Sequence, residues 1–547
     1  MKLKLILLAI SGSLILSANA QQKPQASAPG TLPRPKLVIG LMVDQMRWDY
    51  LYRYYERYGS GGFKRLLNEG FTCENTYINY IPSVTGVGHS TVYTGSVPAI
   101  HGIAANDFII QATGKSMYCA EDSTVQTVGS TSVSDGKMSP RNLLVTTMTD
   151  ELRLATNFRS KVIGIALKDR GSILPAGHTA NAAYWYDENT GNWITSTYYM
   201  NTLPPWVTKF NEQKLPEKYM KQNWNTLYPI NTYVQSTKDD SPYEGKFAGA
   251  AAPVFPVMTS TMRLSTINTT PYGSTLTLDL AKAAVENEGM GADAITDFLA
   301  VSVSSPDYVG HQFGPNSIEV EDTYLRLDRD IASFLTFLDA KVGKGNYSLF
   351  LTADHGAYNN VNFLTDNKIN AGLFPAAESL RNLNAQLEQQ FKVKGLVINL
   401  GNYQVNLNNP AIAANKLDEA AVKKAAINFM KKVQGVLYVI DMADVQNANI
   451  PSAYKDQIIN GYNAERSGAI QLILKPGWYS GSRTGTTHGT ISPYDTHIPL
   501  VFMGWGIKQG KSNVSHNMTD IAATMSALLR IQEPSGNIGK PITEVLK

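Results

Sequence analysis

The sequence of 547 residues predicts an α/β protein whose core is a mostly parallel β-sheet flanked by helices. Continuous apolar runs rich in Val, Ile and Leu are typical of strands buried on both faces of such a sheet. Segments with helical periodicity lie between these runs, as expected for an α/β core. Hydrophobic residues make up 43% of the chain, which is enough for a large core. The mean hydropathy of -0.18 argues against a polytopic membrane protein.

The first residues have the pattern of a secretory signal peptide. Lys2 and Lys4 precede an apolar stretch at 5–16, and residues 18–20 read Ala-Asn-Ala, a typical cleavage signal. The apolar stretch is shorter than the ~20 residues that a membrane helix needs. We therefore expect residues 1–20 to be cleaved and residues 21–35 to form a Pro-rich tether. The resulting protein would be periplasmic or secreted, without membrane insertion.

The predicted core strands are five apolar runs in the remaining domain, residues 36–547. They occupy residues 36–43, 161–167, 298–303, 347–353 and 498–503.

The clearest predicted helix follows Asn316, which with Glu319 resembles the start of a capping box. Apolar residues then recur at spacings of three and four, which predicts one buried helix face. These residues are Tyr324, Leu327, Ile331, Phe334 and Leu338.

Two stretches of the domain at residues 36–547 are predicted to be insertions, near residues 180–262 and 360–484. The first is rich in Tyr, Trp and Pro, and residues 184–199 suggest a β-hairpin, although these aromatic rings could instead stack on an aromatic ligand. The second contains a helical pattern at 417–433 followed by a strand-like VLYVI segment, which suggests a small α/β lobe.

Charge and cysteine content limit the possible partners. The net charge is +3, of which Lys2 and Lys4 supply two, so the mature chain has no basic footprint for nucleic acid. Cys73 and Cys119 could form one disulfide or remain free thiols. The sequence leaves the oligomeric state open, with a monomer favoured.

Several predicted strands end in residues that can hold a metal ion. Ligands bind at the carboxyl ends of strands in open α/β sheets, so these residues are expected to converge. Three carboxylates and three imidazoles favour zinc, with manganese or iron as alternatives, and six ligands suggest a two-metal site. The candidates are Asp44, Asp307, His311, Asp354, His355 and His488.

Thr85 is the candidate nucleophile. It precedes Gly86 and Gly88 at the expected start of a helix, where free backbone N–H groups could seat a phosphate. Lys168 and Arg170 follow a predicted strand two residues apart, so in extended backbone they would face the same way. Asn106 offers an amide donor nearby.

Individually, most of these residues have a more ordinary explanation. A single Asp after a strand is usually a turn or helix cap, an isolated His is usually structural, and a Thr before a helix is usually a cap. Five further histidines are expected to be packing, hydrogen-bonding or surface residues: His89, His101, His178, His497 and His516.

Together, the motifs resemble the alkaline phosphatase superfamily, and within it the phosphate-irrepressible enzymes with two zinc ions and a threonine nucleophile. The resemblance runs from about Lys36 to Leu546. It rests on VDQMRWDYLYRYY, IPSVTGVGHST, HGIAANDF, LKDRGSILPAGH, SPDYVGHQFGPNS, TADHGA, GTTHGT and SPYDTHIPLVFMGWGI.

The resemblance implies a role for each candidate. Asp307, His311 and His488 would hold one zinc ion; Asp44, Asp354 and His355 would hold the other, with the Thr85 oxygen beside it. Asn106, Lys168 and Arg170 would contact the phosphoryl oxygens.

We therefore expect a zinc-dependent alkaline phosphatase that hydrolyses small phosphate monoesters through a phosphothreonine. The nearest alternative is a phosphodiesterase or nucleotide pyrophosphatase with the same two-zinc core. A sulfatase is disfavoured because neither cysteine opens a C-x-P-x-R motif. The predicted signal peptide argues against a cytoplasmic mutase. A non-catalytic zinc-binding protein is disfavoured because the nucleophile and anion-binding candidates are all present.

Overall fold

The computed structural model describes residues 33–547, and residues Arg34–Lys547 form one compact unit. The predicted signal peptide and most of the predicted tether lie outside the described residues. Within the described part of the chain, no helix has the length and apolar character needed to cross a bilayer.

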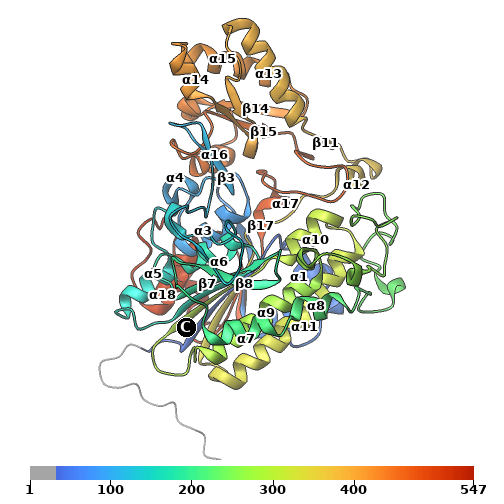
Figure 1. The fold of residues 1–547 in the computed structure, drawn as a ribbon, viewed down its shortest axis with the longest axis vertical. Coiled ribbons are helices and arrows are strands. Elements are labelled where there is room, and N and C mark those ends of the chain that lie inside the picture. Colours follow the sequence, from blue (N-terminus) through green and yellow to red (C-terminus); the bar gives the residue numbers. More distant parts are fainter. Residues whose placement is uncertain (1–32) are drawn as a thin grey trace, which may run out of the picture. The chain divides into compact units, whose positions relative to one another are not determined.

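An 11-stranded mixed sheet forms the core (Figure 1). Its strand order is β17-β2-β18-β10-β1-β9-β6-β7-β8-β5, and β19 pairs with β2 off this path. The central five strands run parallel, and all their residues are buried, as the apolar runs predict. These are β10 (Tyr347–Thr352), β1 (Leu37–Val43), β9 (Asp297–Val303), β6 (Val162–Ala166) and β7 (Ala182–Asp187).

The flanks of the sheet depart from the predicted parallel arrangement. β18 (Leu500–Gly504), which contains most of the last apolar run, pairs antiparallel with both β10 and β2 (Phe71–Tyr77). Burial on both faces produces an apolar run in either direction, so the run alone could not reveal strand direction. β17 (His497–Ile498) is also antiparallel to β2, whereas β19 (Gly510–Asn517) is parallel to it.

The aromatic segment forms the hairpin that its sequence predicts. β7 pairs antiparallel with β8 (Asn192–Ser196), and β8 pairs with β5 (Thr127–Val128). The rings of Tyr186 and Trp193 pack edge to face with centroids 6.1 Å apart. Packing within the hairpin therefore accounts for this pair, whereas Trp185 and Tyr186 also line the cavity that Lys168 and Arg170 line.

Helices cover the two faces of the sheet (Figure 1). α3 (Thr85–Thr94), α5 (Met148–Ala155), α6 (Asp169–Ala176) and α18 (Asp520–Leu529) form one layer. α9 (Pro271–Asn287) and α11 (Ile318–Leu338) belong to the other.

The predicted buried face of α11 is confirmed, because all five of its apolar residues are buried. The predicted cap is one residue out. The Ser317 hydroxyl, rather than the Asn316 amide, accepts the Val320 N–H at 3.1 Å.

Residues within 376–474 form a second sheet, of order β12-β13-β15-β14, with its own apolar cluster. The strands are β12 (Val397–Asn399), β13 (Gln404–Leu407), β15 (Ile470–Leu474) and β14 (Val436–Asp441). α13 (Ala376–Phe391) and α15 (Glu419–Met430) pack together, α13 against β12 and α15 against β14.

The remaining elements are short. The helices are α1 (Tyr50–Arg53), α2 (Phe63–Glu69), α4 (Pro98–His101), α7 (Pro205–Glu212), α8 (Leu215–Met220), α10 (Ser305–Phe313), α12 (Val361–Asp366), α14 (Asn409–Ala414), α16 (Ser452–Gly461) and α17 (Pro493–Thr496). The strands are β3 (Asp107–Ile110), β4 (Lys115–Tyr118), β11 (Gly372–Leu373) and β16 (Trp478–Tyr479). Cys73 and Cys119 are both buried free thiols.

Gly88 allows α3 to approach the end of β10 closely. A Cβ at this position would lie 2.3 Å from the backbone oxygen of Asp354, too close for any real side chain. Since Thr85 starts the same helix, this contact also fixes where the helix begins relative to the carboxyl end of β10.

We predict that Gly88→Ala lowers the free energy of unfolding by about 1–3 kcal/mol through overpacking, despite the higher helix propensity of Ala. Urea denaturation would measure the change. Gly59→Ala is a suitable control, because a Cβ there would meet only Asp328 Oδ2, at 3.4 Å. Equal stability of Gly88→Ala and the parent protein would contradict the close approach.

Candidate active site

The carboxyl ends of the parallel strands bring the predicted metal ligands together. Asp44 directly follows β1, and Asp354 and His355 follow β10. Asp307 and His311 lie four residues apart on α10, the helix after β9, so they share one helix face. His488 comes from the loop between β16 and α17.

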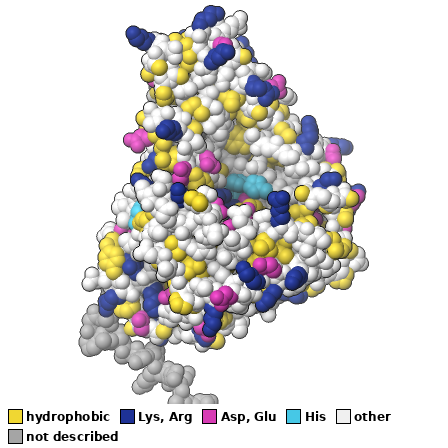
Figure 2. Space-filling view, viewed as in Figure 1, with side chains coloured by type: hydrophobic (Ala, Val, Ile, Leu, Met, Phe, Trp, Pro, Cys, Tyr) yellow, Lys and Arg dark blue, Asp and Glu magenta, His cyan; other side chains and the backbone are white. Residues whose placement is uncertain are grey.

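The six side chains form two triads, which we call the Asp307 triad and the Asp44 triad. The first contains Asp307, His311 and His488, and the second contains Asp44, Asp354 and His355. Within each triad, one ligand atom from each residue lies within 4.8 Å of the others. Figure 2 shows histidine side chains in a hollow on this face, with charged side chains around them.

Each of the three imidazoles is oriented by a backbone carbonyl. Nδ1 of His311, His355 and His488 lies 2.9, 3.0 and 2.8 Å from the oxygens of Thr486, Gly356 and Ser83, respectively. If each Nδ1 carries the proton and donates it, each Nε2 keeps a free lone pair. Histidine ligands in metal sites are commonly oriented in this way.

The Nε2 atoms point towards the carboxylates of their own triads. His311 Nε2 lies 3.2 Å from Asp307 Oδ1, and His355 Nε2 lies 3.4 Å from Asp354 Oδ2. Asp44 Oδ1 and Asp354 Oδ2 are buried, and neither accepts a hydrogen bond from any described residue. Buried carboxylate oxygens normally have partners, so a cation between them would fit this arrangement.

Burial also shapes the charge state of the site. It lowers the pKa of His355 and of His488, which favours neutral imidazoles that can act as ligands. Burial and the nearby Asp354 carboxylate raise the pKa of Asp44, and the Lys168 ammonium opposes that rise. The pocket therefore favours positive charge near its carboxylates.

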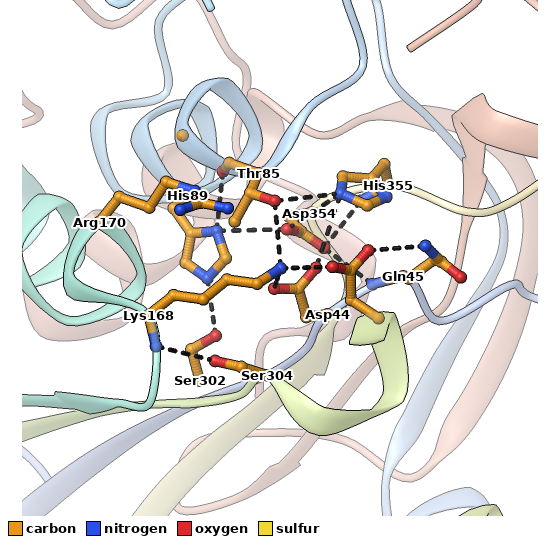
Figure 3. A network of polar contacts seen from close by, with 12 residues as sticks. Asp44, Gln45, Thr85, His89, Lys168, Arg170, Ser302, Ser304, Asp354 and His355 are labelled. Atoms are coloured by element: carbon orange, nitrogen blue, oxygen red, sulfur yellow. Dashed lines mark hydrogen bonds and ion pairs between the residues drawn. The ribbon is translucent and has the colours of Figure 1, made fainter. Parts of the chain in front are cut away.

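Lys168 supplies such a charge, and Figure 3 shows its ammonium beside Asp44 and Thr85. Its Nζ lies 2.6 Å from Asp44 Oδ2 and 2.5 Å from Asp307 Oδ2, and 3.5 Å from Thr85 Oγ1. A single buried ammonium thus contacts one carboxylate of each triad and the candidate nucleophile.

Thr85 is the first residue of α3 and is 1% exposed. Its Oγ1 lies 3.5 Å from His355 Nε2, beside the Asp44 triad. The Gly86 N–H donates to Asn106 Oδ1 at 2.7 Å. This N–H is therefore not free to bind a phosphate, in contrast to the expectation from the sequence. The same bond turns the Asn106 carbonyl towards the helix and leaves its Nδ2 as the available donor.

Arg170 lies close to Lys168, although the predicted geometry was wrong. Lys168 is the N-cap of α6 and Arg170 belongs to its first turn, so the two residues do not share an extended backbone. Arg170 Nη1 donates to the Tyr118 hydroxyl at 3.1 Å, and its buried Nε has no partner among the described residues. Lys168 and Arg170 both line a cavity of about 310 Å³ with Tyr118 and Tyr308.

Two further residues contact the site. Gln45, which no sequence pattern singled out, donates to side chains of both triads. His89 was expected to be a packing or hydrogen-bonding residue. Its Nδ1 lies 2.8 Å from the Thr85 carbonyl oxygen, and its Nε2 lies 2.7 Å from Ser302 Oγ. Its position four residues after Thr85, one helical turn away, was an available signal.

Comparison with known proteins identifies the family of this chain. A profile described as type I phosphodiesterase / nucleotide pyrophosphatase matches residues 38–502. The chain belongs to this family. Human ectonucleotide pyrophosphatase / phosphodiesterase 5 shares the fold at 15% identity, with a TM-score of 0.52 over 93% of this chain and 99% of that one.

Several relatives within the family are much more similar. Alkaline phosphatase PhoV of Synechococcus elongatus is 53% identical over 554 residues, 100% of both chains. Alkaline phosphatase PafA of Elizabethkingia meningoseptica is 53% identical over 526 residues, 95% of this chain and 96% of that protein. A Myroides odoratus protein named calcium-transporting ATPase is 59% identical over 524 residues, 94% of this chain and 95% of that protein.

The crystal structure of wild-type PafA superposes with a TM-score of 0.93 at 53% identity, over 94% of this chain and 100% of that one. The predicted membership of the alkaline phosphatase superfamily, the fold class and the enzyme class of phosphatase are therefore confirmed.

Asp495 connects the loops that carry His355 and His488. Its Oδ2 accepts hydrogen bonds from both the N–H and the hydroxyl of Thr490, each at 2.7 Å, and its backbone oxygen accepts the Gly356 N–H at 2.7 Å. Burial raises the pKa of this carboxyl to about 7.

A raised carboxyl pKa means that the folded protein binds this proton more tightly than the unfolded chain does. The contribution of Asp495 to stability should therefore fall as pH rises from about 4 to about 7. We predict that the stability of Asp495→Asn, which imitates the protonated acid, increases relative to that of the parent protein as pH rises from about 4 to about 7. Urea denaturation of both metal-free proteins would test this. A difference independent of pH would contradict the raised pKa.

Proposed function

We propose that this protein is a zinc-dependent phosphomonoesterase in which Thr85 is the nucleophile. The observation that carries the proposal is the position of Thr85 Oγ1, 3.5 Å from both His355 Nε2 of the Asp44 triad and the Lys168 ammonium. A hydroxyl beside a metal triad and a buried cation can react as an alkoxide. The names of the PhoV and PafA relatives support the same activity.

Two zinc ions per chain are proposed as the cofactor, one in each triad. Imidazoles and carboxylates are suitable zinc ligands, and the buried oxygens Asp44 Oδ1 and Asp354 Oδ2, which accept no hydrogen bond from the described residues, fit a cation. When bound, zinc would favour deprotonation of coordinated oxygens and neutralise charge on the attacking and leaving oxygens.

Four residues of the chain are proposed to act directly on the substrate. Thr85 Oγ1 would form a bond to phosphorus while the bond to the leaving oxygen breaks, which gives a phosphothreonine and an alcohol after the leaving oxygen gains a proton. Water would then cleave the phosphothreonine to regenerate Thr85 and release inorganic phosphate. Asn106 Nδ2 and the side chains of Lys168 and Arg170 would bind the phosphoryl oxygens and orient the ester.

A crystal structure of a PafA variant supports this assignment by residue type. It carries substitutions of a threonine, an asparagine, a lysine and an arginine, the same four types proposed here for the nucleophile and the anion-binding groups. The variant superposes on this chain with a TM-score of 0.93 at 52% identity, over 94% of this chain and 100% of that one.

Small phosphate monoesters are the proposed substrates because two cations and an amide suit a dianionic phosphoryl group. A diester has one charge fewer and one substituent more to accommodate. The alternative, a phosphodiesterase or nucleotide pyrophosphatase, is named by the family profile itself. The N-terminal sequence pattern supports export to the periplasm or the medium, which we also propose.

We predict that replacing both Lys168 and Arg170 with Ala lowers kcat/KM for an aryl phosphate monoester by at least about 10²-fold. The loss for the matching diester should be much smaller, because its phosphoryl group carries less charge. Both rates should be measured on protein of known zinc content. Equal losses would contradict the charge-based preference, and faster diester cleavage by the parent protein would favour the alternative function.

We also predict that Thr85→Ala abolishes the phosphoenzyme and lowers kcat by several orders of magnitude. Acid quenching during turnover of a ³²P-labelled monoester would trap the phosphothreonine. Thr85→Ser is the matched control, because it retains a hydroxyl and should still give a labelled protein. An unchanged yield of phosphoenzyme from Thr85→Ala would exclude this nucleophile.

A further inference from the structure

Gln45 is bonded to both metal triads. Its backbone N–H donates to Asp354 Oδ1 at 3.1 Å, and its side-chain Nε2 donates to Asp307 Oδ1 at 2.6 Å. The residue is 3% exposed, so water does not compete freely for these bonds. Asp307 Oδ1 is also the oxygen that lies 3.2 Å from His311 Nε2. The amide therefore holds the oxygen that faces the Asp307 triad.

The backbone at Gln45 has an unusual conformation that makes both bonds possible. Its φ angle is 63°, in the left-handed region that residues other than glycine, asparagine and aspartate seldom adopt. Such a conformation persists only where the surrounding contacts determine it. Here it turns the chain directly after Asp44, so that the N–H and the side chain of one residue reach opposite triads.

Gly310 gives the Gln45 amide its space. A Cβ at Gly310 would lie 1.9 Å from Gln45 Oε1 and 3.0 Å from Gln45 Cδ. Gly310 belongs to α10, between Asp307 and His311, so the glutamine packs against the helix that supplies two ligands of one triad. The amide thus fixes Asp307 by a hydrogen bond and contacts its helix directly.

We propose that Gln45 is a positioning residue for both zinc sites, through two separate bonds: its amide orients Asp307, and its backbone N–H orients Asp354. This inference rests on the proposed two-zinc site. The two bonds act on different triads, so they can be separated by substitution. Loss of the side-chain bond should weaken zinc binding at the Asp307 triad and leave the Asp44 triad unchanged.

Gln45→Asn is the variant that separates them. Asparagine tolerates the left-handed backbone and keeps the N–H bond to Asp354, but its side chain is shorter by about 1.5 Å and does not reach Asp307. Gln45→Gly removes the side chain altogether and is free of backbone strain. Both variants should bind one zinc ion about 10- to 100-fold more weakly than the parent protein, the usual effect of losing a residue that orients a metal ligand.

The measurement is a competition titration with a zinc chelator, with the zinc remaining on the protein counted by elemental analysis. A chain that also carries Asp307→Asn identifies the affected site, because Gln45→Asn should cause no further loss there. The inference is overturned if both sites keep the parent affinities. It is also overturned if both sites weaken equally while the metal-free proteins unfold at the same urea concentration.

Gly310→Ala tests the same contact from the other side. Its methyl group should displace the Gln45 amide and selectively weaken the same zinc site. In the Gln45→Gly background the space is free, so the added substitution should have little further effect. Additive losses would contradict the contact. Failure of the proposed function is distinguishable, because the parent protein would then lack two bound zinc ions or phosphomonoesterase activity.

Discussion

The burial of three carboxylates at one edge of a sheet is the constraint on which the site depends. Asp44, Asp307 and Asp354 are each no more than 3% exposed. Ionised carboxylates are unfavourable in such surroundings unless cations and hydrogen-bond donors compensate them. The Lys168 ammonium, the Gln45 amide and backbone N–H groups supply part of this compensation. The proposed zinc ions would supply the rest, and the order of the site would then depend on them.

The parallel strands bring these carboxylates together at one edge of the sheet. Each of β1, β9 and β10 is held by its neighbours in register, so the residues that follow them are placed with little freedom. The nucleophile comes from a different layer, at the start of α3, and Gly88 allows that helix to reach the end of β10. The chemistry therefore arises between a rigid sheet edge and one helix terminus.

Much of this arrangement could be predicted from sequence because burial leaves a pattern. Apolar runs revealed the central strands, and the residues that end or follow them include the candidate metal ligands that the structure brings together. The direction of β18 could not be read, because a strand buried on both faces looks the same either way. Lys168 and Arg170 were correctly expected to lie close together, but the expectation assumed an extended backbone. In the structure α6 begins between them, at Asp169. Gln45 was missed because an uncharged amide with a left-handed backbone leaves no periodic or charge signal.

The position of His488 in the chain has a consequence for biosynthesis. All members of the Asp44 triad lie within the first 355 residues, whereas the Asp307 triad lacks a ligand until the loop after β16 is present. A chain under synthesis therefore contains all three members of the Asp44 triad before His488, the last member of the Asp307 triad, has been added. If each triad binds an ion as proposed, the last third of the polypeptide supplies the ligand that completes the second site.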